Sequence, residues 1–117
     1  MNGWQGTLET ALGRTFNDED PGYTVELARG TLEVGLYRPP RPDPQQPHQQ
    51  DELYFVVSGH GWFVNDGDRS EIGPGDALFV AAGVPHRFED FSDDLTAWVV
   101  FYGPPGGEQP GDAGLRR

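Results

Sequence analysis

Short apolar segments separated by closely spaced turn residues make up the sequence from Tyr23 onward. The chain of 117 residues contains 17 glycines and 11 prolines, and both residue types are unfavourable inside helices. The segments that we predict to be strands are 23–28, 31–37, 53–57, 62–64, 69–72, 77–80, 86–88 and 95–102. Many short strands joined by tight turns indicate an antiparallel sandwich or barrel, so the predicted fold class is all-β.

Local patterns support individual strands in this plan. Residues 23–28 alternate between polar and apolar, which is typical of a strand with one buried face. Residues 53–57 are rich in β-branched and aromatic side chains, which favour strands. The pair Asp66-Gly67 lies between two such segments and is a typical hairpin turn.

The length of the chain leaves room for one domain with one core. We expect an N-terminal arm over residues 1–22, in which residues 7–12 form a helical turn. The barrel is expected over residues 23–103. Residues 104–117 contain mostly glycine, proline and charged residues with little to pack, and we expect a flexible C-terminal tail there.

Composition excludes several classes of function. The sequence has no cysteine, which removes disulfides, thiolate nucleophiles and cysteine-based zinc sites. It also has no lysine side chain for Schiff-base chemistry. The formal net charge of -11 repels phosphate backbones and anionic lipids, so we expect neither nucleic acid nor a membrane as a partner. No apolar run is long enough to span a membrane and no signal-peptide pattern is present, so we expect a cytoplasmic protein.

A proline-rich segment leads into the residues that carry chemistry. Residues 38–48 contain five prolines, which exclude a helix and a central strand and indicate an extended loop. In an extended chain, residues separated by an even number point the same way, so Gln46, His48 and Glu52 should share one face. His86 would join them from a later strand. Two imidazoles and one carboxylate can hold a divalent ion while leaving positions open, and suit Fe, Mn, Ni, Zn or Cu.

Two sequence motifs around these residues resemble the cupin superfamily. His48, Glu52 and Gly59 match the first motif, which runs His-x-His, then Glu, then Gly. The second motif matches residues 74–86, with Gly75-Asp76 near its start and His86 at its end. The resemblance covers roughly residues 30–102 and implies a jelly-roll barrel, also called a double-stranded β-helix. It also implies one divalent metal ion per chain.

Gln46 stands where the first motif has its first histidine. An amide oxygen can coordinate a hard metal weakly and without charge, or it can accept a hydrogen bond from bound water or substrate. We therefore include Gln46 with His48, Glu52 and His86 as a candidate ligand.

Six further residues are candidates for the walls of a pocket, and each could equally be ordinary core. Tyr54 and Val56 share the parity of Glu52, and Tyr54 could bring its hydroxyl near the metal. Phe88 shares the parity of His86. The remaining candidates are Phe63, Trp98 and Tyr37.

The resemblance leaves three classes of function open. The first is a metal-dependent enzyme acting on a small organic molecule, with dioxygenase-type chemistry favoured because it is common among similar small cupins, and isomerase or lyase chemistry as the alternative. The second is a barrel that binds or senses a small molecule without turnover. The third, a structural role, is the least favoured. Small cupins commonly pair through a sheet face or an exchanged N-terminal strand, so we expect a homodimer.

Overall fold

The computed structural model describes residues 2–14 and 21–109. Within these residues one short helix precedes eight strands. The elements are α1 (Leu8–Leu12), β1 (Tyr23–Arg29), β2 (Leu32–Tyr37), β3 (Asp51–Ser58), β4 (Gly61–Asn65), β5 (Asp68–Ile72), β6 (Ala77–Val80), β7 (His86–Glu89) and β8 (Thr96–Tyr102). The prediction of an all-β fold is confirmed.

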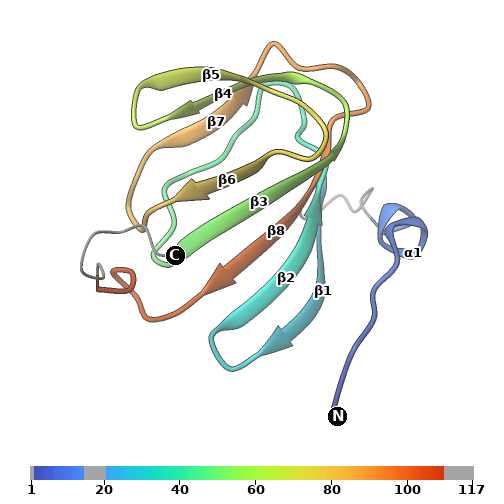
Figure 1. The fold of residues 1–117 in the computed structure, drawn as a ribbon, viewed down its shortest axis with the longest axis vertical. Coiled ribbons are helices and arrows are strands. Elements are labelled where there is room, and N and C mark those ends of the chain that lie inside the picture. Colours follow the sequence, from blue (N-terminus) through green and yellow to red (C-terminus); the bar gives the residue numbers. More distant parts are fainter. Residues whose placement is uncertain (1, 15–20, 110–117) are drawn as a thin grey trace.

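The strands form two antiparallel sheets that lie one over the other (Figure 1). The larger sheet has five strands in the order β1-β2-β8-β3-β6, and the smaller has three in the order β5-β4-β7. Strand β8 lies between β2 and β3, so the last of the described strands joins two parts of the larger sheet that come from earlier in the sequence.

The strand boundaries follow the sequence patterns closely. Each of the eight predicted segments corresponds to one observed strand, although β3 begins two residues earlier than predicted, at Asp51. The hairpin between β4 and β5 turns through Asp66 and Gly67, whose φ angles are 52° and 88°. Two successive positive φ angles define the type I′ turn, whose twist matches that of the flanking strands.

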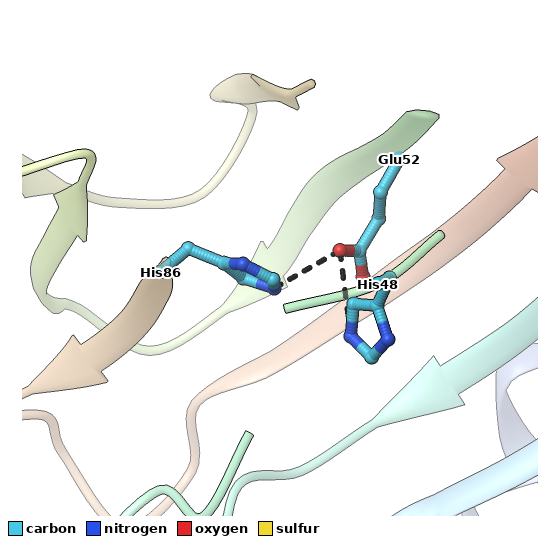
Figure 2. A group of neighbouring side chains, drawn as sticks. All are labelled: His48, Glu52 and His86. Carbon is cyan, nitrogen blue, oxygen red and sulfur yellow. Dashed lines mark ion pairs between the residues drawn. The ribbon is translucent and has the colours of Figure 1, made fainter. Parts of the chain in front are cut away.

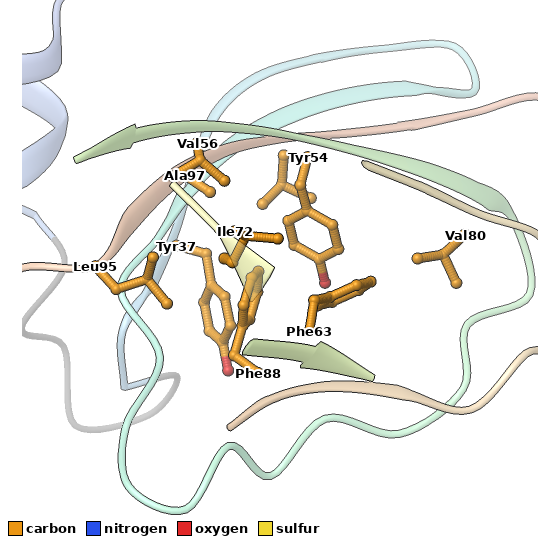
Figure 3. Packing of buried hydrophobic residues seen from close by; sticks show 10 residues of the cluster. Tyr37, Tyr54, Val56, Phe63, Ile72, Val80, Phe88, Leu95 and Ala97 are labelled. Carbon is orange, nitrogen blue, oxygen red and sulfur yellow. The ribbon is translucent and has the colours of Figure 1, made fainter. Parts of the chain in front are cut away.

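The core lies between the two sheets (Figure 3). At its centre the rings of Phe63 and Phe88 are 4.8 Å apart, and the ring of Tyr54 packs edge-on against both. Residues Glu52, Tyr54 and Val56 of β3 are all buried, so this strand points its even-numbered side chains inward as predicted.

The N-terminal segment packs beside the larger sheet. Helix α1 forms within the predicted range 7–12, and the hydroxyl of Thr7 caps it by accepting a hydrogen bond from the backbone amide of Thr10. Ala11 is fully buried, and Arg14 forms an ion pair with Glu26 of β1. In the part of the chain that the structure describes, no helix is both long and apolar enough to cross a membrane.

The segment after β8 turns back onto the barrel, where we expected the flexible tail to begin. The amide of Gly106 donates to the carbonyl of Gln49 at 2.7 Å, and the amide of Glu108 donates to Asp51 Oδ2 at 2.9 Å. Backbone amides rather than apolar side chains thus attach the first residues of this segment to the barrel. Residues 110–117 of the expected tail lie outside the described residues.

Candidate metal centre

Three of the four candidate metal ligands meet inside the barrel (Figure 2). Glu52 lies at the start of β3, His86 is the first residue of β7, and His48 ends the proline-rich loop. One ligand atom from each of the three lies within 4.8 Å of the others. Glu52 and His86 are buried and His48 is half-buried, so the cluster is reached from the His48 side.

Hydrogen bonding fixes the orientation of the His86 ring. Its Nδ1 atom lies 2.9 Å from the carbonyl oxygen of Val84, and because a carbonyl can only accept, Nδ1 carries the hydrogen. In the neutral ring, Nε2 then presents a lone pair. This atom lies 3.0 Å from Glu52 Oε1 and 3.1 Å from the side-chain oxygen of Gln45. A lone pair facing two oxygens requires a cation or a proton between them.

The oxygen atoms around His86 also raise the pKa of its ring. Burial alone would lower this pKa, but hydrogen bonding to Glu52 and to the Val84 carbonyl outweighs burial and raises it above its ordinary value. Burial lowers the pKa of His48, and the neighbouring Glu52 carboxylate only partly opposes that effect. The neutral form of His48, which is the form that binds metals, is therefore favoured.

Two buried polar atoms at the cluster lack hydrogen-bond partners, and they test whether a metal fits. They are His48 Nε2 and Glu52 Oε1, which lie 3.8 Å apart. Glu52 Oε1 also lies 3.0 Å from His86 Nε2, and the two atoms form a hydrogen bond when the His86 ring is protonated. In the neutral ring their lone pairs face each other and form none. Burying an unpaired polar group costs about 1–3 kcal/mol. A divalent cation held by His48 Nε2, Glu52 Oε1 and His86 Nε2 would remove both penalties, so these residues fit a metal.

The glutamine that faces the cluster is Gln45, and the candidate ligand Gln46 is exposed. The Gln45 Nε2 atom donates to Asp43 Oδ2 at 2.7 Å, which turns its oxygen toward His86. The parity argument failed here because residues 38–50 form no strand, and the backbone bends at residues 49–50 between His48 and Glu52. The even-number rule holds only along extended chain.

Asp43 is a buried residue that sequence reasoning missed. Its carboxylate accepts hydrogen bonds from the hydroxyl of Tyr37 at 2.5 Å and from the backbone amide of Phe88 at 2.9 Å, in addition to Gln45. These bonds attach the proline-rich loop to β2 and β7. An aspartate among five prolines is usually a turn residue, so nothing in the sequence pattern distinguishes it.

Tyr54 brings its hydroxyl to the edge of the metal centre. The hydroxyl donates to the Gln45 side-chain oxygen at 2.5 Å. Burial raises the pKa of Tyr54 well above its ordinary value, and the nearby Glu52 carboxylate raises it further. The phenol therefore stays protonated at neutral pH and acts as a hydrogen-bond donor beside the cluster.

A cavity of about 370 Å³ opens beside the cluster. The described residues that line it are Pro21, Tyr23, Glu33, Tyr37, Pro44, Gln45, His48, Glu52, Tyr54, Val99 and Phe101. Of the six residues proposed for the pocket walls, Tyr37 and Tyr54 line this cavity. Val56, Phe63 and Phe88 belong to the core instead.

Trp98 lies on the opposite face of the larger sheet. Its neighbours on β8, Ala97 and Val99, are buried in the core, and side chains alternate along a strand. Trp98 therefore points away from the cavity, and its assignment to the pocket was wrong. The parity of β8 relative to the core could not be read from a segment that is apolar on both faces.

Comparison with known proteins places the chain in a family. A family model described as the cupin domain matches residues 28–102. The chain belongs to the cupin family. This cupin is 39% identical over 87 residues to an uncharacterized protein of Streptomyces coelicolor, which covers 73% of this chain and 83% of the relative. It is 30% identical over 73 residues to the dimethylsulfoniopropionate lyase DddQ of Ruegeria pomeroyi.

The lyase match covers 62% of this cupin but 34% of the lyase, so the chain spans about a third of that relative's length. Among solved structures, the Cupin 2 conserved barrel domain protein from Salinispora arenicola superposes with a TM-score of 0.59 at 17% identity. That match covers 69% of this chain and 74% of the other. It supports the expected jelly-roll barrel.

Proposed function

We propose that this cupin is a mononuclear metal-dependent enzyme that acts on a small organic molecule by lyase- or isomerase-type chemistry. The observation that carries the proposal is the His48–Glu52–His86 cluster, with its two unpartnered buried atoms, in the wall of a cavity. A divalent ion bound there would act as a Lewis acid toward an oxygen of the bound molecule.

The residues around the cluster have separate parts in this proposal. Asp43 holds the Gln45 amide so that its oxygen faces the metal centre, where it would serve as a weak fourth ligand or accept a hydrogen bond from a bound water. The protonated Tyr54 hydroxyl can shift its hydrogen bond from Gln45 to a ligand oxygen and stabilise negative charge that develops there. The core aromatic rings behind Tyr54 exclude water from that side.

Non-redox chemistry is favoured here over the dioxygenase-type chemistry expected from the family. The support is the sequence match to a protein named as a lyase and the presence at the cluster of a phenol that donates a hydrogen bond. A dioxygenase remains the second candidate, because a cluster of two histidines and one carboxylate also suits iron. Oxygen consumption by the iron-loaded protein, measured with phenolic, thiol and keto-acid substrates, separates the two.

Metal content tests the proposal directly, and the chain provides a matched control. We expect about one divalent ion per chain in protein purified without an affinity tag. The variant His86→Ala should lose most of this metal, whereas His60→Ala should keep it, because His60 is exposed and follows the end of β3 opposite to Glu52. Circular dichroism checks that both variants are folded. Full metal content in His86→Ala would contradict the assignment.

Turnover distinguishes an enzyme from a binding barrel. With Zn, Mn, Fe, Ni or Cu loaded, product formation from a panel of small carboxylates and keto acids supports the enzyme. Saturable binding of these molecules without any turnover or oxygen uptake would instead support a binding or sensing role.

A further inference from the structure

We propose that the end of the cavity away from the metal cluster binds a cationic head group, of the ammonium or sulfonium type, through Glu33 and the aromatic rings beside it. The proposal rests on the proposed function in one respect, because an oxygen of the same molecule would be anchored at the metal. The head-group proposal specifies the sign of the charge that the substrate carries, which the metal cluster alone does not determine.

The sheet register places Glu33 opposite the cluster across the floor of the cavity. Phe101 of β8 pairs with Glu33 of β2 on one side and with Glu52 of β3 on the other. Residues paired across neighbouring strands point to the same face, so all three side chains face the interior. Strands are spaced about 4.8 Å apart, which separates the two carboxylate-bearing positions by about 10 Å.

The charge of the cavity favours a cation at the Glu33 end. Two carboxylates, Glu33 and Glu52, are among its lining residues, and the described residues that line it include no arginine. The carboxylate of Glu52 lies in the metal cluster. Glu33 is therefore the charged group that a ligand extending away from the metal would meet, and an anionic head group there would be repelled.

Aromatic rings complete the wall around Glu33. The hydroxyl of Tyr23 donates to Glu33 Oε2 at 2.7 Å, which fixes the direction of the carboxylate. The Tyr23 ring meets Phe101 edge-on with their centroids 6.4 Å apart, and it meets Tyr37 in the same way at 6.3 Å. Aromatic faces attract alkylated ammonium and sulfonium groups, and a carboxylate adds charge complementarity. Rings and one carboxylate are thus gathered at one end of the cavity.

Gly35 makes this arrangement of rings possible. It lies between Glu33 and Tyr37 on the inner face of β2, and a Cβ at this position would lie 2.4 Å from the Tyr23 ring. The missing side chain lets Tyr23 lie across the strand and reach Glu33. A molecule that fits both ends therefore carries an oxygen donor, a short carbon chain and a positively charged head.

The charge preference can be measured with two probes of nearly the same shape. Trimethylglycine and 3,3-dimethylbutanoate differ in a quaternary nitrogen against a quaternary carbon, and both carry a carboxylate for the metal. By isothermal titration calorimetry on the metal-loaded protein, trimethylglycine should bind about tenfold more tightly. The variant Glu33→Gln should remove this preference. Glu71→Gln, an exposed position on β5, should retain it.

Equal binding of the two probes, binding of neither, or a preference that survives in Glu33→Gln would overturn the proposal. Metal analysis of the same samples keeps the two proposals apart. A loaded protein without a charge preference contradicts only the head-group site. If no metal binds, tetramethylammonium, which has no ligand for a metal, tests the head-group site alone. It should bind to the wild type and be lost in Glu33→Gln, and failure to bind the wild type would overturn the site.

Discussion

Asp43 determines which glutamine of the proline-rich loop faces the metal centre. It accepts from Gln45 Nε2 and so directs the amide oxygen at His86, while the neighbouring Gln46 is left exposed. The orientation of an amide is thus set by one buried carboxylate from the same loop. Because the amide is already oriented, its oxygen could bind the metal with little further loss of side-chain conformational entropy.

The two adjacent glutamines provide a matched pair for a test of this role. We expect Gln45→Ala to weaken metal binding about tenfold or more, because it removes an oxygen that faces His86 Nε2. Gln46→Ala should leave the affinity unchanged. Competition with a chromogenic chelator measures both. Equal affinities in the two variants would mean that the Gln45 oxygen makes no contribution to the centre.

Whether the sequence could place a side chain at the site depended on whether the residue lies in a strand. Glu52 and Tyr54 were placed correctly because side chains alternate along β3, and His86 was found through the second motif. Gln45 and Asp43 were missed because a proline-rich loop has no period that could assign its side chains to a face. Glu33 does lie in a strand, and the parity that it shares with Tyr37 was the available signal for it. Phe101 had no such signal, because β8 is apolar on both faces.

At the scale of elements, the close fit between β1 and β2 depends on Gly35. A Cβ there would meet the Tyr23 ring at 2.4 Å and the backbone carbonyl oxygen of Thr24 at 2.5 Å. The ring can rotate away, but the carbonyl belongs to the paired strand. The glycine is therefore required by the close approach of strand β1 rather than by its own backbone angles.

Replacing this glycine should destabilise the protein measurably. We expect Gly35→Ala to lower the free energy of unfolding by about 1–3 kcal/mol, the usual cost of overpacking. Gly73→Ala is the matched control, because a Cβ at that position meets nothing within 4 Å. Its effect should stay within about 0.5 kcal/mol. Urea denaturation compares the two, and an equally stable Gly35→Ala would show that β1 shifts at little cost.

The existence of all eight strands followed from the sequence, but their pairing did not. Short apolar runs and turn residues are local signals, whereas the pairing of β3 with β8 joins residues 38 to 51 positions apart. For this chain the two motifs supplied the missing information by resemblance to a family of known fold. The attachment of residue 106 to Gln49 and of residue 108 to Asp51 had no signal in the sequence, since it uses backbone amides.

At the scale of the whole molecule, the outer face of the larger sheet has apolar side chains in contact with solvent. Phe55 and Phe79 are 43% and 50% exposed. Phe79 pairs with Leu53 of β3, and Phe55 pairs with Trp98 of β8, so these residues form one patch on the outer face. Exposed apolar patches on a sheet are typical of protein interfaces.

We expect this patch to be the interface of the homodimer that the sequence led us to propose. Sedimentation equilibrium at low salt should give twice the chain mass for the wild type. Phe79→Asp should shift the protein toward the monomer, because it places a charge in an apolar contact. Glu71→Asp on the other sheet should not. Monomer mass for the wild type would contradict the dimer.

The central position of β8 bears on when the protein becomes functional during its synthesis. Of the strands that the structure describes, β8 leaves the ribosome last, and it separates β2, which carries Glu33, from β3, which carries Glu52. Until Phe101 has emerged, the cavity has no floor, and the nascent chain presents two unconnected parts of a sheet. The two ends of the cavity are therefore joined only after β8 has been translated. An incomplete chain would expose its metal ligands without a closed site around them.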